Sequence, residues 1–237
     1  MQAVSLFVDV LLNILRDPQG LEVAGKAREA MDSSRNLLDS LLNLSVLEAG
    51  TLTADLREVA ASDIIQPLAL EFASQFERSG LHFRCVGSRA RIHTDPVLMQ
   101  RILRNLLINA LRYTDSGKVL LGCRRRGTQL QLEVWDTGPG IPADKLPMIF
   151  EEFYQLDIPS RETVKGLGLG LAIVARTARL MGHRVGVRSV PGRGTGFAVA
   201  APRAGRPLEE DAVRPAGSTS PGPPNPAPHP RSGWHWS

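Results

Sequence analysis

Cysteine, aromatic residues and long hydrophobic runs are all scarce in this 237-residue sequence. Its two cysteines, Cys85 and Cys123, are too few for a disulfide framework or a cysteine zinc site and suit a reducing compartment. Aromatic residues make up only 5%, so aliphatic side chains must supply most of the core. No apolar run is long enough to span a bilayer, and no signal-peptide pattern precedes the first predicted helix. These absences predict a cytoplasmic chain that makes no membrane contact itself, and they leave room for a membrane anchor in a longer parent protein.

An excess of charge of one sign is also lacking. The formal net charge is +4, and the only tight basic cluster is the arginine run at residues 124–126. A solvated strand end or turn accounts for such a run better than nucleic-acid contact does, so no nucleic-acid partner is predicted. The hydrophobic fraction of 43% is ordinary for a protein with a real core.

Two amphipathic helices are predicted at the N-terminus. Apolar residues recur at helical spacing over residues 4–15 and again from about 21–48, and a Pro–Gly break separates the two patterns. Gly50 stands where a C-terminal cap belongs. An antiparallel hairpin over residues 1–50 cannot bury its apolar stripe alone, so we expect a homodimer in which two hairpins form a four-helix bundle. Packing of the hairpin on its own downstream domain is the alternative.

A second domain is predicted over residues 51–202, where helical and strand patterns alternate. Helices are expected over residues 62–78, 95–113 and 168–181, and strands over residues 53–59, 81–86, 119–125, 129–135, 184–190 and 196–201. Interleaved helices and mostly antiparallel strands indicate an α+β fold, a two-layer α/β sandwich. Beyond Pro202 the sequence is dominated by Pro, Gly, Ser and Ala, so residues 203–237 are predicted to be a disordered tail.

Two asparagines mark one face of the helix predicted over residues 95–113. Asn105, Asn109 and Arg112 are spaced i, i+4 and i+7 and therefore share a face. An asparagine oxygen can complete the octahedral shell of a magnesium ion that phosphates already hold. Arg112 and Tyr113 would then meet a phosphate and the ribose or base. An ordinary amphipathic helix with a solvated polar face is the alternative.

Two glycine-rich turns follow that helix in the sequence. Asp136 ends a predicted strand and begins the sequence D-T-G-P-G-I. Gly138 and Gly140 let the backbone of this turn approach a flat base, and the Asp136 carboxylate can accept a hydrogen bond from the amino group of that base. The same peptide also makes an ordinary β-turn. Further on, Gly166, Gly168 and Gly170 lead into a helix, and backbone N–H groups at a helix start form an anion site for phosphates. Such a glycine pattern also marks flexible loops. The aperiodic stretch between the two turns is expected to act as a lid over a bound nucleotide.

Together these motifs resemble the ATP-binding domain of the GHKL superfamily and, within it, of the bacterial sensor histidine kinases. The resemblance covers residues 51–202 and includes the N box around Asn105 and Asn109, the G1 box D-T-G-P-G-I, the F box I-F-E-E-F-Y-Q, the G2 box K-G-L-G-L-G-L and a final G-R-G-T-G-F. It implies a Bergerat-type fold that binds ATP and Mg²⁺. It implies that Asn105 and Asn109 are the magnesium ligands, and it adds Leu171 and Thr195 to the nucleotide-binding residues.

The resemblance extends upstream, where L-L-D-S-L-L-N-L-S-V-L-E-A-G-T-L is similar to the second helix of a dimerisation and phosphotransfer hairpin. Such kinases pass the phosphate from a histidine to an aspartate on a response-regulator receiver domain. The chain begins just after the box that supplies the histidine, so the resemblance implies that the acceptor is missing and that this fragment does not phosphorylate itself in cis. None of the five histidines fits that role: His82, His93, His183, His229 and His235.

The sequence departs from the family pattern at three positions. Arg112 replaces a lysine, and a planar guanidinium differs from an ammonium in how it meets phosphate. Leu167 stands where many relatives have threonine. Asn105 heads the N box, where the ATPases of the superfamily have a water-activating glutamate, and this favours phosphate transfer to a protein over hydrolysis. A GHKL-type ATPase, or a non-catalytic module for dimerisation and docking, remains the alternative.

Overall fold

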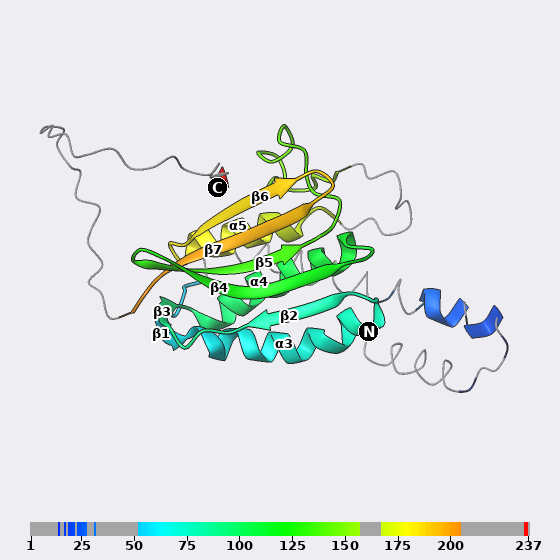
Figure 1. Ribbon diagram of the computed structural model, residues 1–237, viewed down its shortest axis with the longest axis horizontal. Coiled ribbons are helices and arrows are strands. Elements are labelled where there is room, and N and C mark those ends of the chain that lie inside the picture. Colours follow the sequence, from blue (N-terminus) through cyan, green and yellow to red (C-terminus); the bar gives the residue numbers. More distant parts are fainter. Residues whose placement is uncertain are drawn as a thin grey trace, which may run out of the picture.

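The computed structural model describes residues 52–156, 167–204 and 235–236, together with scattered positions between 14 and 31. The predicted N-terminal hairpin falls largely outside the described residues, so its pairing and the boundary near residue 50 stay predictions. Within the described part, Figure 1 shows helices layered against a twisted sheet. None of the described helices combines the length and the apolar character that a membrane crossing requires.

The main sheet has six strands and is almost entirely antiparallel. In spatial order they are β2 (His82–Val86), β4 (Lys118–Arg126), β5 (Gln129–Asp136), β7 (Gly194–Pro202), β6 (Arg184–Val190) and β8 (His235–Trp236). Only β2 pairs in parallel, with β4. A separate two-stranded sheet joins β1 (Arg57–Ala60) to β3 (Arg91–Thr94). Gly127, at φ +57°, lies in the turn that joins β4 to β5.

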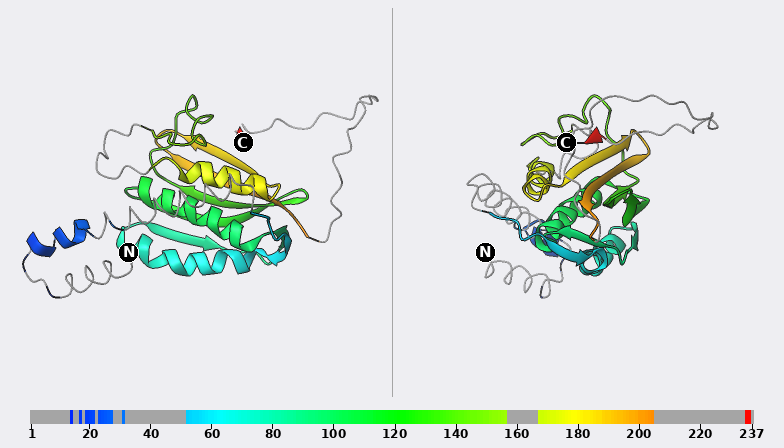
Figure 2. Two further views of the ribbon diagram at one scale, coloured as in Figure 1. Left: turned by 180° about the vertical axis from the view of Figure 1, so that it is seen from behind. Right: turned by 90° about the vertical axis from the view of Figure 1, so that its left-hand side faces the viewer.

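Three helices cover one face of the main sheet, as the rear view in Figure 2 shows. They are α3 (Ala61–Arg78), α4 (Pro96–Tyr113) and α5 (Gly170–Leu180). The start of α4 follows directly from the sequence: the Asp95 carboxylate accepts hydrogen bonds from the backbone N–H groups of Val97 and Leu98 at 2.9 and 3.0 Å. Pro96 occupies the first helical position, where its missing N–H costs nothing. The two-layer α+β fold predicted from the sequence is confirmed.

The core lies between the helices and the sheet. Alternate strand residues point to the same face, and the inward set is apolar and buried. It comprises Val119 and Leu121 of β4, Leu130, Leu132 and Val134 of β5, Val185 and Val187 of β6, and Phe197, Val199 and Ala201 of β7. Helices α3 and α4 contribute Ile64, Ile65, Leu68, Phe72, Phe76, Ile102, Leu103, Leu106 and Leu107. This continuous core fixes α4 on the sheet and so fixes the polar face that α4 presents at the other side.

Several element boundaries differ from the predicted ones. Helix α5 begins at Gly170 and not at Gly168, because Gly168 has a φ of +72° that a right-handed helix cannot accommodate. Strand β3 was not predicted, and the parallel pairing of β2 is an exception to the expected antiparallel pattern. In the tail predicted to be disordered, His235 and Trp236 form strand β8 against β6.

Candidate functional site

A pocket lies where the ends of α4 and β5 meet the start of α5. Its lining residues are Asn109, Tyr113, Asp136, Pro139, Gly140, Ile141, Ile149, Tyr154, Gln155, Leu156, Leu171, Thr195 and Phe197. The lining is largely apolar and aromatic, with few polar groups, which is the usual make-up of a site for a flat organic ligand. Of the residues predicted from the sequence, the pocket brings together Asn109, Tyr113, Asp136, Gly140, Leu171 and Thr195.

Asp136 is the only carboxylate among the lining residues of this pocket. Its Oδ1 accepts hydrogen bonds from the backbone N–H groups of Gly138 at 2.9 Å and Thr195 at 3.3 Å. None of the described groups donates to Oδ2. Burial raises the pKa of the Asp136 carboxyl above its ordinary 3.8, and the two N–H donors partly offset that rise. The carboxylate is therefore fixed through one oxygen, and the other oxygen is free to accept a hydrogen bond from a ligand.

Ser189, on β6, is a residue of this site that the sequence reasoning missed. Its Oγ accepts a hydrogen bond from the Ile141 N–H at 2.7 Å and lies 2.9 Å from the Thr195 hydroxyl. It donates to the Gly194 carbonyl at 3.1 Å, so the Thr195 hydroxyl must be the donor of their shared bond. Ser189 thus ties the G1 turn to β7. A lone serine near the end of a strand carries no sequence signal of such a role.

Glycine is required at two positions of the G1 turn. A Cβ at Gly138 would lie 2.8 Å from the Tyr113 carbonyl oxygen and 2.9 Å from Asp136 Oδ1. Gly140 has a φ of +71°, and a Cβ there would overlap the carbonyl of Val190. The turn therefore packs directly against α4 on one side and against the end of β6 on the other.

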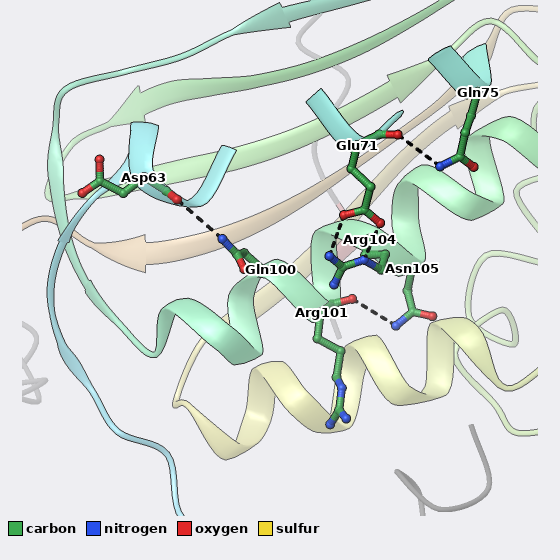
Figure 3. A network of polar contacts seen from close by, with 7 residues as sticks. All are labelled: Asp63, Glu71, Gln75, Gln100, Arg101, Arg104 and Asn105. Atoms are coloured by element: carbon green, nitrogen blue, oxygen red, sulfur yellow. Dashed lines mark hydrogen bonds and ion pairs between the residues drawn. The ribbon is translucent and has the colours of Figure 1, made fainter. Parts of the chain in front are cut away.

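Asn105 and Asn109 meet the start of α5. A Cβ built on Gly170 would lie 3.7 Å from Asn109 Oδ1 and 3.8 Å from Asn105 Oδ1, so both amide oxygens lie close to the first residue of that helix. The Nδ2 of Asn105 donates to the Arg101 carbonyl at 3.1 Å, which orients its oxygen (Figure 3). The first turn of α5 has no acidic residue and no side-chain cap. The first residue of α5 and the two amide oxygens therefore lie close together.

A bidentate ion pair joins α4 to α3 next to Asn105. Arg104 Nε and Nη2 donate to the two carboxylate oxygens of Glu71 on α3 at 2.9 and 2.7 Å (Figure 3). The bonds from Arg104 lower the pKa of Glu71. Gln100 Nε2 donates to the Asp63 carbonyl at 3.5 Å, one turn earlier. These contacts fix the rotation of α4 beside Asn105 without entering the pocket.

Some predicted site residues lie outside the pocket lining. Arg112, Asn105, Gly138, Gly168 and Gly170 are not among its lining residues, and Gly166 lies outside the described part of the chain. Gly168 closes against the F box: its carbonyl accepts a hydrogen bond from the Phe153 N–H at 3.1 Å. Phe153 has a φ of +61°, which is rare for a residue with a side chain.

Metal binding by side chains alone finds no support in the described residues, which contain no cluster of three or more His, Cys, Asp or Glu side chains suited to an ion. Amide oxygens are a different donor set. Asn105 and Asn109 present such oxygens at the start of α5, and they fit an ion whose remaining ligands come from phosphate and water.

Comparison with known proteins agrees with this geometry. Residues 94–205 match the family of histidine kinase-, DNA gyrase B- and HSP90-like ATPases. The chain is 30% identical to sensor histidine kinase RcsC of Escherichia coli (strain K12) over 199 residues, which are 81% of this chain and 21% of RcsC. It is 33% identical to sensor protein KdpD of Rathayibacter rathayi over 206 residues, 85% of this chain and 24% of KdpD. The chain thus spans about a fifth to a quarter of the length of these relatives.

Solved structures extend the comparison. Full-length ShkA in complex with AMPPNP superposes with a TM-score of 0.67 at 30% identity, over 84% of this chain and 42% of ShkA. Acinetobacter baumannii histidine kinase AdeS gives 0.60 at 19% identity, over 85% of this chain and 93% of AdeS, and shows the fold alone. The fold is therefore that of a GHKL-type ATP-binding domain. Within that superfamily, the chain carries the catalytic ATP-binding domain of a histidine kinase.

Proposed function

We propose that this chain is the ATP-binding catalytic part of a two-component sensor histidine kinase, which transfers the γ-phosphate of ATP to a histidine and then to a response-regulator aspartate. One observation carries the proposal. Asp136, whose Oδ2 has no donor among the described groups, and Asn109 line the same pocket, and the amide oxygens of Asn105 and Asn109 lie close to Gly170 at the start of α5. A group that can read a base and a group that can meet a metal and phosphate are thus brought close together by the fold.

Adenine binding is assigned to the apolar end of the pocket. Asp136 Oδ2 would accept a hydrogen bond from the adenine amino group, while Ile141 and Ile149 line the surface against the ring. Because Oδ1 is already occupied by two backbone donors, the carboxylate is preorganised and loses little freedom on binding. Thr195 supports it through its backbone N–H.

Magnesium and phosphate binding are assigned to the start of α5. The Asn105 and Asn109 oxygens would hold Mg²⁺ together with phosphate oxygens, and the first-turn N–H groups of α5 would meet the phosphate chain. Arg112 and Tyr113 would contact phosphate and the ribose or base. Gly166, Gly168 and the segment before them would form the lid. A bound magnesium ion neutralises charge that develops on the phosphates during transfer.

Transfer to a protein suits Asn105 better than hydrolysis does. A carboxamide cannot accept a proton from water as a glutamate can, so Asn105 can serve as a ligand and not as a base. In the proposed reaction a histidine imidazole nitrogen forms a bond to the γ-phosphorus, and the bond to the β,γ-bridging oxygen breaks to release ADP. The phosphohistidine then passes its phosphate to an aspartate of a receiver domain. A homodimer formed through residues 1–50 is proposed as the assembly that brings histidine and ATP together.

Calorimetric titration with ATP tests this assignment. The protein should bind ATP more tightly with magnesium than with EDTA, and Asn109→Ala should weaken binding and remove most of the magnesium dependence. Val97→Ala is the control, because Val97 lies on the same helix, is exposed and lies outside the pocket. Equal affinity in magnesium and EDTA for the unmodified protein would remove the metal from the proposal. Absence of ATP binding would overturn the proposal as a whole.

Phosphate transfer is tested separately with γ-labelled ATP. We expect acid-labile label to appear on a histidine-bearing kinase hairpin supplied in trans, and none on the chain alone. Acid-labile phosphohistidine on the chain itself would show that one of its five histidines is an acceptor after all.

A further inference from the structure

We propose that the free edge of strand β6 is a seat for an added strand and that the C-terminal residues His235–Trp236 of the same chain occupy it. Figure 1 shows the C-terminus beside β6, far along the sequence from that strand. The two pair antiparallel, with Gly186 opposite Trp236 and Val187 opposite His235. The ATP site does not account for this contact, nor for the aromatic ending W-H-W-S of the sequence.

Strand β6 has the properties of an edge that accepts a partner. One of its sides pairs with β7 through seven residue pairs, from Arg184↔Ala200 to Val190↔Gly194. Its sequence, R-V-G-V-R-S-V, contains no proline and pairs with β7 without a bulge, and its two charged residues, Arg184 and Arg188, lie outside the two positions that pair with β8. Val185 and Val187 are buried, so the strand is firmly set in the sheet. An unpaired edge of this kind is a template for another strand.

The register favours an aromatic residue as the occupant. In this register Gly186 lies opposite Trp236, and Val187 lies opposite His235. Edge glycines are positions at which an aromatic residue on the paired strand is stabilising. Aromatic and β-branched residues are also the best strand formers.

Chain length favours pairing within one molecule. Strand β7 ends at Pro202, beside the start of β6, and residues 205–234 connect that point to β8. Strand β8 lies two strands away from β7, which is roughly 10 Å. About thirty residues can span up to about 100 Å when fully extended, so the connection is more than long enough. A partner on the same chain also reaches a higher effective concentration than a second copy does in dilute solution.

Occupation of the seat has a consequence for the nucleotide pocket, and this part rests on the proposed function. Ser189 follows the paired residues of β6 by two positions and carries the hydrogen bonds to Ile141 and Thr195. The end of the same strand packs against Gly140 through Val190. A strand added at Gly186 and Val187 would therefore stabilise the end of β6 that contacts the G1 turn.

Hydrogen–deuterium exchange of β6, measured without nucleotide, tests the seat. Alternate residues of a strand direct their amides to opposite neighbours, so one of the Gly186 and Val187 amides faces β8. Removal of residues 235–237 should speed exchange in a peptide covering residues 184–190, and a synthetic peptide of residues 231–237 should restore protection. Unchanged exchange would overturn the proposal, and so would protection in the full chain that falls on dilution, because pairing would then be between molecules.

Paired substitutions separate backbone pairing from side-chain loss. His235→Pro with Trp236→Pro removes both amide donors and should behave like the truncation, whereas His235→Thr with Trp236→Val keeps them and should retain protection. If both pairs of substitutions expose β6 equally, backbone pairing is not the cause. ATP affinity of the truncated chain should fall by a few-fold. If exchange of β6 becomes faster but ATP affinity does not change, β8 pairs with β6 without affecting the pocket. If exchange does not change, the pairing is refuted, and the ATP-binding proposal is still tested by the calorimetric titration.

Discussion

Replacing Asp136 with asparagine should weaken ATP binding and stabilise the empty protein at the same time. The substitution keeps the shape of the side chain and keeps an Oδ1 that can accept from Gly138 and Thr195. It replaces the open Oδ2 with an NH₂ group that cannot accept from the adenine amino group. A hydrogen bond to a charged group contributes about 1.5–3 kcal/mol. At about 1.4 kcal/mol per factor of ten, affinity for ATP should fall roughly 10- to 100-fold.

The stability of the empty protein should change in the opposite direction. Burial raises the pKa of Asp136, so between its ordinary 3.8 and the raised value the native state binds more protons than the unfolded state. Native stability is therefore lost as pH rises through that window, and ionised Asp136 costs stability at neutral pH. Asp136→Asn removes that cost. The midpoint of urea denaturation at pH 7 should rise, and the difference from the unmodified protein should shrink below pH 4.

Inosine triphosphate makes the assay specific to the proposed contact. Its base carries an oxygen where adenine carries the amino group, so the unmodified protein should prefer ATP strongly. In Asp136→Asn the new NH₂ group can donate to that oxygen, and the preference should narrow or reverse. Asp144→Asn, which removes the same charge from an exposed position, serves as the control and should change neither affinity. An unchanged ratio of ATP to inosine triphosphate affinity in Asp136→Asn would refute the adenine contact.

Three further outcomes follow from the structure. Gly140→Ala should destabilise the fold clearly more than Gly182→Ala in chemical denaturation, because both glycines have a positive φ but a Cβ meets backbone only at Gly140; equal losses would contradict the close approach. Arg104→Ala should lower the free energy of unfolding by about 0.2–1 kcal/mol at pH 7, since its ion pair with Glu71 is about 40% exposed. This loss should disappear in acid, where Glu71 is protonated below its lowered pKa. A loss that persists at pH 2 would indicate that packing, and not the ion pair, is responsible. Burial lowers the pKa of His183 to about 4. The free energy of unfolding should therefore fall by on the order of 3 kcal/mol as pH falls from 6.5 to 4, and His183→Gln should flatten the pH dependence of stability in that range.

Long periodic segments and strong caps were predictable from the sequence. Helix α4 was placed correctly because Asp95 and Pro96 give a start signal and the apolar pattern runs unbroken to Tyr113. Strands β2, β4, β5, β6 and β7 were predicted from the alternation of apolar and polar residues, whereas their order in the sheet was not. Strand β3 was missed because four residues are too few to show a period, and the parallel pairing of β2 has no local signal.

The candidate site was predictable to the extent that single residues carry its chemistry. Asp136 and Asn109 line one pocket as expected, because the turn and the helix that bear them are defined locally. Ser189 and Arg104 could not be found in this way. Each acts through a partner far along the chain, at Ile141 and at Glu71, and only the fold brings these pairs together.

The contact between Phe153 and Gly168 limits how strongly the length of the chain between them affects the stability of the domain. The Phe153 N–H to Gly168 carbonyl bond closes the base of the segment that joins them, and the ion pair between Glu152 and Arg176 lies beside it. Once the ends of a loop are joined, doubling its length costs only about 0.6 kcal/mol. Lengthening the chain between Phe153 and Gly168 should therefore cost little folding free energy. Under the proposed function, a fluorophore inserted there should report ATP binding.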